Sequence, residues 1–427
     1  MLEVSQLSID GLLSNVSFQL HPSQRLGIIG ESGSGKSLTA LSLIGLLPSK
    51  LRARGSIKFF DQELIGVSDK KLRPLRGKRI AIVFQEPMSA LDPLMKIGAH
   101  VTGTQLSEVG LDPELANRYP HELSGGQRQR ILIAMAMAHK PDILICDEPT
   151  TALDTTSSQQ VLKVINELVE RHHTALIFIS HDLNVIEYMS DDVIVMCQGE
   201  IVEAGPSVLS NPRHEYTQEL IAASQPNPAA PQPATGESVI VIDRVTKSFG
   251  ATPVLNDFHL KVLRGERLGL VGDSGTGKTT ALKLIAGLIE PDSGDITVKG
   301  SVQMVFQDPQ GSLNPRMRIE DIVAEGGSRD QVDEVLQEVG IDPGHKRRYP
   351  HEFSGGQRQR ISIARAIIGN PDILLADEAV SALDVSVRAQ ILELLERLVA
   401  ERGMTLVFIS HDQHAIQQLC NRIVTVK

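Results

Sequence analysis

Two loops in this sequence have the residue types and spacing that cradle a phosphate group. They read GESGSGKS, at residues 30–37, and GDSGTGKT, at residues 272–279. Their glycines let backbone N–H groups turn inward around an anion, and the helix that follows adds its partial positive charge. The lysine would reach the β- and γ-phosphates of a nucleotide, and the next hydroxyl would ligate Mg²⁺. The predicted nucleotide-binding residues of these loops are Gly30, Ser32, Gly33, Gly35, Lys36, Ser37 and Leu38 in the first copy, and Gly272, Ser274, Gly275, Gly277, Lys278, Thr279 and Thr280 in the second.

Each loop has a matching pair of acids further along the chain. The apolar runs ILICDE and ILLADE end in Asp147 with Glu148 and in Asp377 with Glu378. A carboxylate at the end of a buried strand is costly unless it serves a cation or a hydrogen-bond network. We therefore predict that the two aspartates join the Mg²⁺ shell and that the two glutamates polarise an attacking water. The alternative is a pair of solvated acids at the sheet edge.

A histidine and a glutamine complete each set. His181 and His411 close the apolar runs ALIFIS and TLVFIS, where they would contact the γ-phosphate. A single histidine of this kind is often structural, but here the context is repeated. Gln85 and Gln307 end the runs AIVFQ and QMVFQ, from which they would reach the Mg²⁺ or the attacking water and link site occupancy to an outside partner. The plainer alternative is a glutamine that caps the following loop.

The four motifs recur in the same order because the chain is internally duplicated. SGGQRQRI occurs at residues 124–131 and 354–361, and the Ser of this motif, the Asp of each Asp-Glu pair and the His all shift by 230 residues. The phosphate-loop Lys shifts by 242 and the Gln by 222, so the front halves of the copies differ. Four ordered motifs that occur twice indicate two nucleotide-hydrolysing domains in tandem.

Alternating strands and helices are expected to position these residues. Short β-type runs alternate with helical stretches such as 37–47 and 127–139, which predicts a mostly parallel sheet with helices on both faces in each copy. A stretch rich in Pro, Ala and small polar residues separates the copies and is typical of an exposed linker. The predicted division is therefore a first domain at 1–222, a linker at 223–237 and a second domain at 238–427.

Composition narrows the class of protein further. The net charge of −10 argues against a protein that coats nucleic acid. The three cysteines lack metal-ligand spacing, and buried thiols in a reducing cytosol account for them. No apolar segment approaches the ~18 residues that would span a bilayer, and the first residues lack the pattern of a signal peptide. Any membrane role is therefore expected to come through partners.

The combined motifs resemble the nucleotide-binding domain of ABC transporters, twice over and across nearly the whole chain. They comprise GxxxxGK[ST], VFQ, SGGQ, the strand with Asp-Glu, [ST]ALD at 151–154 and 381–384, and the strand-end His. The resemblance implies an α/β fold of two tandem P-loop NTPase domains, each with an antiparallel β subdomain and a small helical subdomain. It also implies ATP and Mg²⁺ as cofactors and ATP hydrolysis as the reaction.

In that family two such domains pair head to tail, so that the SGGQ loop of one covers the ATP held by the other. The resemblance would place the first SGGQ loop over the ATP on Lys278 and the second over the ATP on Lys36. The resemblance also leads us to expect an aromatic side chain that stacks on adenine. In the second copy this residue would be Phe249, whereas the first copy offers no aromatic there. Because the stacking would be lost, we hypothesise that the first site binds ATP more weakly. The SGGQ residues concerned are Ser124, Gly125, Gly126 and Gln127, and Ser354, Gly355, Gly356 and Gln357.

Finer features are similar to the ATPases of oligopeptide, dipeptide and nickel importers. They include the RYPHE blocks before each SGGQ and NPRHEYTQELIAA after the first domain. This subgroup implies two permease subunits and an extracellular solute-binding protein as partners, no nucleic acid, and a place at the cytoplasmic face of the membrane. The cargo would be a peptide, nickel, a metal chelate or a similar small solute. The rivals are a soluble twin ABC protein that acts on ribosomes or DNA, and an exporter ATPase.

Overall fold

The chain forms two compact units, Met1–Ser224 and Gln225–Lys427, in the computed structural model. Helix α7 (Glu215–Ser224) continues two residues into the segment predicted as linker, and the first strand of the second unit starts at Ser238. The structure describes residues 1–84, 90–151, 153–224, 236–250, 252–273, 275–380, 383, 385–410 and 412–426.

A sheet of parallel strands lies at the centre of each unit. The strand order is β10-β9-β3-β8-β7-β6 in the first unit, where only β10 is antiparallel to its neighbour, and β15-β16-β17-β13-β18 in the second. Strands β7, β8, β16 and β17 are buried at every position, as continuous apolar runs in a doubly covered sheet should be. The bounds are β3 Arg25–Ile29, β6 Ile80–Val83, β7 Ile143–Asp147, β8 Ala175–Ile179, β9 Asp192–Cys197, β10 Glu200–Gly205, β13 Arg267–Val271, β15 Val302–Val305, β16 Ile373–Asp377, β17 Thr405–Ile409 and β18 Arg422–Thr425.

A second, antiparallel sheet covers one side of each unit. The strand order is β2-β1-β4-β5 in the first unit and β12-β11-β14 in the second. Strands β1 and β2 alternate buried and exposed positions over much of their length, as expected where one face packs on a core and the other meets water. The bounds are β1 Leu2–Ile9, β2 Leu13–Leu20, β4 Ala53–Phe59, β5 Gln62–Glu63, β11 Ser238–Phe249, β12 Thr252–Leu263 and β14 Ser293–Val298.

Helices fill the connections between strands. The α-helices of the first unit, besides α7, are α1 Lys36–Leu43, α2 Asp69–Leu72, α3 Gly103–Glu108, α4 Gly125–Met137, α5 Thr155–His172 and α6 Leu183–Met189. Those of the second unit are α8 Lys278–Ile285, α9 Pro309–Ser312, α10 Ile319–Ala324, α11 Val332–Glu338, α12 Gly355–Ile367, α13 Val385–Arg402 and α14 Gln413–Leu419. Short 3₁₀ helices are η2 Ile97–Ala99, η3 Pro113–Asn117, η4 Pro120–Glu122, η5 Arg329–Gln331, η6 Pro343–His345 and η7 Pro350–Glu352.

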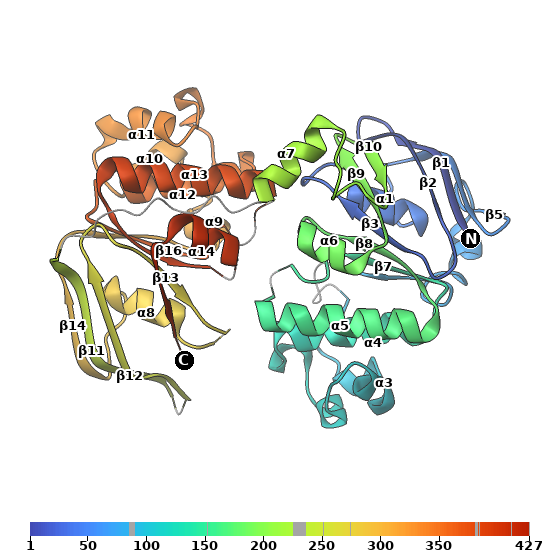
Figure 1. The fold of residues 1–427 in the computed structure, drawn as a ribbon, viewed down its shortest axis with the longest axis horizontal. Helices are drawn as coiled ribbons and strands as arrows, with labels where there is room; N and C mark the ends of the chain where they lie inside the picture. The colour runs from blue at the N-terminus through green and yellow to red at the C-terminus, as the bar shows by residue number, and fades with distance from the viewer. Residues whose placement is uncertain are drawn as a thin grey trace. The chain divides into compact units, whose positions relative to one another are not determined.

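The hydrophobic core of each unit lies on both faces of its central sheet. In the second unit one cluster joins β11, β12 and β14 to α8 and to the near face of the parallel sheet, and a separate cluster joins the other face to α10–α14. Figure 1 shows α8 between the antiparallel sheet and the parallel strands. In the first unit a cluster joins β1, β2 and β4 to α1 in the same way. The helix after each phosphate loop is therefore held between two sheets.

The two helices singled out from the sequence have different bounds from those predicted. Helix α1 ends at Leu43, four residues before the predicted end, because Gly45 takes a left-handed backbone (φ 62°) that closes it. Helix α4 begins at Gly125 rather than at residue 127, because Ser124 caps it and the two glycines form its first turn. The second difference matters, since it turns the SGGQ motif into a helix N-terminus.

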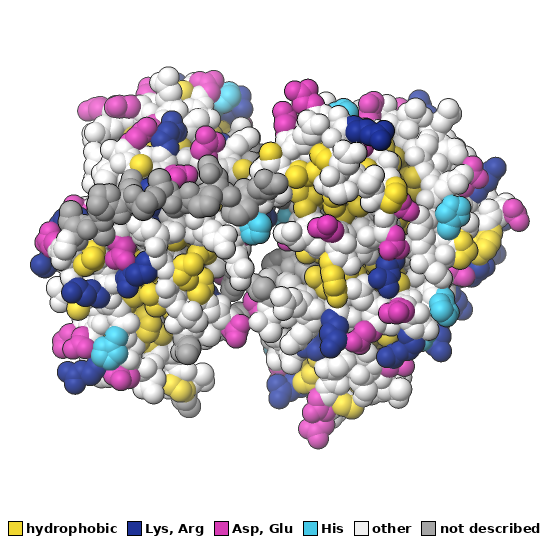
Figure 2. Space-filling view, in the orientation of Figure 1, with side chains coloured by type: hydrophobic (Ala, Val, Ile, Leu, Met, Phe, Trp, Pro, Cys, Tyr) yellow, Lys and Arg dark blue, Asp and Glu magenta, His cyan; other side chains and the backbone are white. Residues whose placement is uncertain are grey.

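Charges of both signs are interspersed on one face of the molecule (Figure 2). On the face drawn in Figure 2, Lys and Arg side chains lie among Asp and Glu side chains in both units. Within the described residues, no helix has both the length and the apolar character needed to cross a bilayer.

Candidate nucleotide-binding and hydrolysis sites

The predicted site residues of the first unit meet at one edge of its parallel sheet. In the register of the sheet, Ile28 of β3 lies beside Ile179 of β8, and Asp147 of β7 lies on the other side of Ile179. The phosphate loop follows β3, the Asp-Glu pair ends β7, and the Ser-His-Asp segment follows β8. Because parallel strands bring their carboxyl ends to the same edge, these three segments are neighbours. Strands β13, β16 and β17 have the same register in the second unit.

Each phosphate loop turns into its helix through a left-handed glycine. Gly35 has φ 99° and Gly277 has φ 92°, and each is the N-cap of the helix that follows. A Cβ atom at Gly35 would lie 2.3 Å from Cδ2 of Leu13, and one at Gly277 would lie 2.7 Å from Cδ2 of Leu255. The left-handed backbone therefore favours glycine at both positions, and an added Cβ atom would also displace a leucine methyl group. Leu38 and Thr280, the last predicted residues of each loop, lie in the first turns of α1 and α8.

The lysine of each loop folds back onto the loop itself. Nζ of Lys36 donates hydrogen bonds of 2.7 Å to the carbonyl oxygens of Gly30 and Glu31. Nζ of Lys278 donates hydrogen bonds of 2.8 Å to the carbonyl oxygens of Gly272 and Asp273. Both side chains are buried, at 5% and 6% exposed, so each cation is fixed inside its loop where a phosphate would need it.

The residue after each lysine bonds to the strand-end aspartate. Oγ of Ser37 donates to Oδ1 of Asp147, and Oγ1 of Thr279 donates to Oδ1 of Asp377, both at 3.1 Å. Burial raises the pKa of both aspartates above the ordinary value, and the neighbouring glutamate adds to this, while the hydroxyl hydrogen bond lowers it. A buried carboxylate with a raised pKa is stabilised by a cation. The pair of hard oxygens in each unit therefore fits Mg²⁺.

The glutamate after each strand has an unusual backbone. Glu148 has φ 49° and Glu378 has φ 46°, which is the left-handed region that residues with a Cβ rarely adopt. Its N–H still bonds the neighbouring strand, to the carbonyl of Ile179 or Ile409 at 2.9 Å. Successive side chains of a regular strand point to opposite faces. The left-handed turn interrupts this alternation directly after the aspartate, so that two adjacent acids can serve one site.

In the first unit the carboxylate of Glu148 contacts a hydroxyl and an imidazole. Oε2 accepts a hydrogen bond of 2.9 Å from Oγ1 of Thr151 and lies 3.3 Å from Nδ1 of His181. Burial by itself raises the pKa of Glu148, but the hydrogen bond and charge of His181 outweigh it, with help from Thr151 and Lys36, and the net pKa is lowered. The group is thus kept ionised, as a base must be.

In the second unit a glutamine bonds to the glutamate. Nε2 of Gln307 donates a hydrogen bond of 2.6 Å to Oε2 of Glu378. The structure thus brings the predicted His to the Glu in one unit and the predicted Gln to the Glu in the other. Three of the predicted residues, Gln85, Ser274 and His411, lie outside the described residues.

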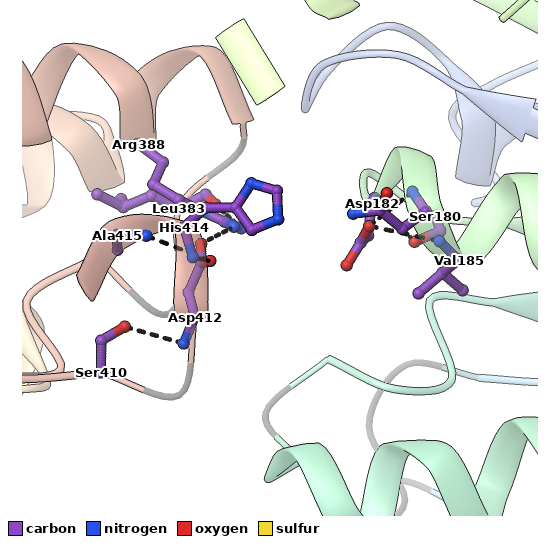
Figure 3. Close-up of polar contacts among 10 residues, drawn as sticks. Ser180, Asp182, Val185, Leu383, Arg388, Ser410, Asp412, His414 and Ala415 are labelled. Carbon is purple, nitrogen blue, oxygen red and sulfur yellow. Dashed lines mark hydrogen bonds and ion pairs between the residues drawn. The ribbon is translucent and has the colours of Figure 1, made fainter. Parts of the chain in front are cut away.

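The residues on either side of each histidine make the same hydrogen bonds in both units (Figure 3). Oγ of Ser180 accepts from the N–H of Asp182, and Oγ of Ser410 accepts from the N–H of Asp412, both at 3.0 Å. Each aspartate in turn caps a helix, α6 or α14, by accepting from two of its first N–H groups. In the second unit an arginine also contacts this aspartate, since Nη1 of Arg388 lies 2.7 Å from Oδ2 of Asp412. Among the described residues of the first unit, no arginine makes the matching contact with Asp182.

Each SGGQ motif forms the start of a long helix. Oγ of Ser124 accepts from the N–H of Gln127 at 3.3 Å, and Oε1 of Gln127 accepts from the N–H of Ser124 at 3.0 Å. The distances are identical for Ser354 and Gln357. The first N–H groups of a helix lack acceptors within it and point outward with the positive end of the helix dipole. The Gly-Gly pair of each motif therefore presents an anion-binding helix end.

The second glycine of each motif is also sterically fixed. A Cβ atom at Gly126 would lie 2.8 Å from Cβ of Ser157, and one at Gly356 would lie 2.4 Å from Cγ1 of Val387. Gly125 is tight as well, at 3.1 Å from Cδ2 of Leu153, whereas Gly355 has open space. Close packing of α4 on α5, and of α12 on α13, thus requires the second glycine in both copies.

The predicted adenine-stacking residue lies at the tip of a hairpin. Phe249 ends β11, is 54% exposed, and has Nζ of Lys247 5.8 Å from its ring centroid. It precedes the left-handed Gly250, and the residue that precedes the matching left-handed Gly11 in the first unit is Asp10. The ring is thus available for stacking in the second unit, and the matching position of the first unit has no ring.

Sequence reasoning assigned no role to two residues that the structure places beside these sites, Arg388 and Tyr216. Oη of Tyr216, in α7, accepts a hydrogen bond of 3.0 Å from the N–H of Glu31 in the first phosphate loop. Arg388 stands where the 230-residue repeat has Ser158, a difference that comparison of the two copies could have found. Tyr216 lies in a segment noted only as a mark of the importer subgroup.

The model of the ABC transporter family matches residues 13–151 and 255–381. This chain belongs to the ABC transporter family. Its relatives include the peptidoglycan transport ATP-binding protein YejF of Agrobacterium fabrum, which is 38% identical over 97% of this chain and 87% of its own length. The glutathione import ATP-binding protein GsiA of Pectobacterium atrosepticum is 37% identical over 96% of this chain and 81% of its own length.

Solved structures share the fold. The archaeal ribosome recycling factor aABCE1, solved in complex with the ribosomal stalk protein aP1, has a TM-score of 0.71 and 22% identity over 97% of this chain and 84% of its own. At that identity the likeness concerns the fold alone. The two matched segments and the relatives make this ABC protein an ATPase with two ATP-binding domains.

Proposed function

We propose that this ABC protein is the ATP-hydrolysing subunit of an importer for peptides or similar small solutes. The observation that carries the ATPase role is the arrangement found in both units, in which a loop-bound lysine, a hydroxyl–aspartate pair and a left-handed glutamate follow one another. The importer role is supported by relatives named for peptidoglycan transport and glutathione import. Both of those solutes contain peptide bonds, which favours a peptide-like cargo over nickel or a metal chelate.

The proposed mechanism uses the residues of each unit in fixed roles. Lys36 and Lys278 bind the β- and γ-phosphates of ATP, and Glu148 and Glu378 orient and polarise the attacking water. His181 and His411 contact the γ-phosphate, and Gln85 and Gln307 sense it. The metal ligands would be Ser37, Gln85 and Asp147 in one unit and Thr279, Gln307 and Asp377 in the other. Bound Mg²⁺ would neutralise charge on the phosphates.

Each ATP would be completed by the other unit. The capped N-termini of α4 and α12 offer N–H groups to an anion, yet Ser124 and Ser354 provide no acid or base of their own. We propose that Ser354, Gly355 and Gly356 close over the ATP on Lys36, while Ser124, Gly125 and Gly126 close over the ATP on Lys278. ATP binding would draw the units together, and release of ADP and phosphate would let them part.

Paired variants test this exchange of residues. In a Lys278→Ala background, which leaves the first phosphate loop intact, Ser354→Ala is expected to weaken ATP binding and Ser124→Ala is not. In a Lys36→Ala background the pattern is expected to reverse. Equal effects of both serines in both backgrounds would contradict the head-to-tail arrangement. The matched backgrounds also separate this effect from the loss of a helix cap, which costs about 1 kcal/mol wherever it occurs.

We propose that the chain binds two permease subunits at the cytoplasmic face of the membrane. Through them it would act with an extracellular solute-binding protein.

In the first unit an apolar cavity of about 210 Å³ lies between β6 and α4 and is lined by Phe84, Ala90 and Leu132 among others. Leu94 and Met95, at 86% and 43% exposed, follow Ala90 in the chain. Exposed apolar side chains are typical of a docking surface, and these two follow, in the sequence, a residue that lines the cavity.

Purification of the native complex tests the whole proposal. Two membrane subunits and a peptide-like bound solute are expected to copurify with the chain, and Leu94→Asp is expected to release the chain from them. The isolated Leu94→Asp chain should still bind ATP, which distinguishes lost docking from lost folding. Recovery of the chain with ribosomes and without a permease would overturn the importer proposal in favour of the soluble twin ABC class.

A further inference from the structure

Helix α7 reaches the first phosphate loop through a single tyrosine. Oη of Tyr216 accepts a hydrogen bond of 3.0 Å from the N–H of Glu31. The same peptide group carries the carbonyl of Gly30, which accepts from Nζ of Lys36 at 2.7 Å. One peptide unit thus joins Tyr216 on one side to the phosphate-binding lysine on the other.

The helix that carries Tyr216 is itself firmly held. Glu203 of β10 accepts from the N–H groups of Arg213 and His214, at 2.9 and 3.1 Å, directly before α7 begins. Thr217 and Leu220 of α7 are buried, at 0% and 4% exposed. A side chain fixed by a packed helix loses less conformational entropy when it makes a hydrogen bond, so Tyr216 is a preorganised partner for the loop.

The hairpin of β9 and β10 supports the same loop. The N–H of Gly199, in the turn between these strands, donates to the carbonyl of Ser34 at 3.1 Å. Burial raises the pKa of the thiol of Cys197, at the end of β9, and the charges of Glu31 and Glu219 add to this. The phosphate loop is therefore contacted by both the β9–β10 hairpin and α7.

We propose that Tyr216 is a positioning residue of the first ATP site, which holds the Gly30–Glu31 peptide so that Lys36 stays directed at the phosphates. The hydroxyl makes no contact with the nucleotide in this role; it acts through the loop backbone. The inference rests on the proposed ATP site at Lys36 and assigns a task to the segment that follows the first domain. It also makes the first site depend on α7, from which the chain leads on to the second unit.

Tyr216→Phe removes the hydroxyl and keeps the ring. A neutral hydrogen bond contributes about 0.5–1.5 kcal/mol, so its loss is expected to weaken ATP binding about two- to tenfold at the first site. The measurement is an equilibrium titration of the full chain with ATP, without Mg²⁺ to prevent turnover. In the Lys278→Ala background the affinity should fall by that factor, and in the Lys36→Ala background it should not change.

Two controls keep a structural effect apart from a positioning effect. Tyr188→Phe makes the same change at a tyrosine that is 60% exposed on α6 and should leave both affinities unaltered. Cys197 is the one partly exposed thiol, since Cys146 and Cys420 are buried, so its alkylation rate reports whether α7 stays docked. That rate should be the same in Tyr216→Phe as in the parent.

Steady-state hydrolysis by the full chain gives the decisive readout. Tyr216→Phe should raise KM for ATP and leave kcat within about twofold, because the hydroxyl acts on ground-state binding. A smaller folded fraction would instead lower kcat at an unchanged KM, and that result would overturn the inference. So would an unchanged or tighter affinity in the Lys278→Ala background, or an equal loss in both backgrounds. If the Lys278→Ala chain, which keeps Tyr216 and Lys36, binds no ATP at all, the proposed first ATP site itself is refuted.

Discussion

Gln307 and Glu378 are joined directly in the second unit, where Nε2 of the amide lies 2.6 Å from Oε2 of the carboxylate. The amide therefore holds the group that is proposed to polarise the attacking water. We predict that Gln307→Ala lowers hydrolysis at the second site about tenfold or more, because a hydrogen bond to a charged group contributes about 1.5–3 kcal/mol. Single-turnover hydrolysis in a Glu148→Gln background measures that site alone. Gln337→Ala, an exposed change on α11, should leave the rate as it was.

Both glutamates are predicted to serve turnover. Glu148→Gln and Glu378→Gln each remove a base that contributes roughly 10²–10⁴-fold at its own site. Each single variant should therefore show less steady-state phosphate release than the parent, and the double variant should show almost none. Glu170→Gln, an exposed change on α5, is the matched control. A parental rate in one single variant would identify that site as catalytically idle.

Arg388 should stabilise the segment after β17, and the matching position of the first unit holds Ser158 instead. Its Nη1 lies 2.7 Å from Oδ2 of Asp412, and its Nη2 donates to the carbonyl of Leu383 at 3.2 Å. We predict that Arg388→Ala raises the rate of amide hydrogen exchange at the start of α14 about tenfold or more, since about 1.5–3 kcal/mol is lost. Exchange followed by mass spectrometry measures α6 and α14 in one sample. Ser158→Ala, at the matching position of the first unit, should change neither helix.

Glu63 gives the first unit a pH dependence in acid. Its carboxylate accepts from Oγ of Ser56 and from the N–H groups of Ile57, Leu64 and Ile65. Burial raises its pKa, but these hydrogen bonds outweigh burial and hold the pKa below its ordinary value near 4.5. The contribution to stability is therefore complete above pH 4.5 and is lost as the pH falls through the lowered pKa of the folded state.

Glu63→Gln tests this dependence. Its free energy of unfolding should be about 1–3 kcal/mol below that of the parent at pH 7, because several donors lose a charged acceptor. The difference should shrink as the pH falls below 4.5 and through the lowered pKa of the folded state, since the parent then loses the same charge. Urea unfolding at a series of pH values provides the measurement, and Glu3→Gln, an exposed change in β1, is the control. A difference that does not vary with pH would contradict the assigned role.

The repeated strands and loops could be predicted because their signals are local. Apolar runs such as 143–147 and 405–409 are buried on both faces of a parallel sheet and carry little polar sequence to confuse the pattern. The order of motifs then placed the chemistry at one sheet edge. Helix ends were less accessible, since the first turn of α4 depends on the cap at Ser124 rather than on apolar spacing.

Other features of the sites depend on residues far apart in sequence. The contact of Tyr216 with Glu31 spans 185 residues, and no local pattern announces it. The left-handed backbone of Glu148 and Glu378 is set by the strand-end hydrogen bond and by packing, since Glu has no preference for that region. The Arg388/Ser158 difference is visible in the sequence, but the partner of Arg388, Asp412, was identified only in the structure. Tertiary structure, and not residue preference, decides these three.

The backbone at Glu148 and Glu378 also has a consequence for directed evolution. At φ values of 49° and 46°, a glycine would relieve strain of roughly 1–2 kcal/mol that any residue with a Cβ must carry. A library screened only for heat resistance would accordingly enrich Glu148→Gly and Glu378→Gly. The selected variants would be more stable but would not hydrolyse ATP. At these two positions, selection for thermal stability favours glycine and selection for ATP hydrolysis favours glutamate, so a screen has to select for both properties.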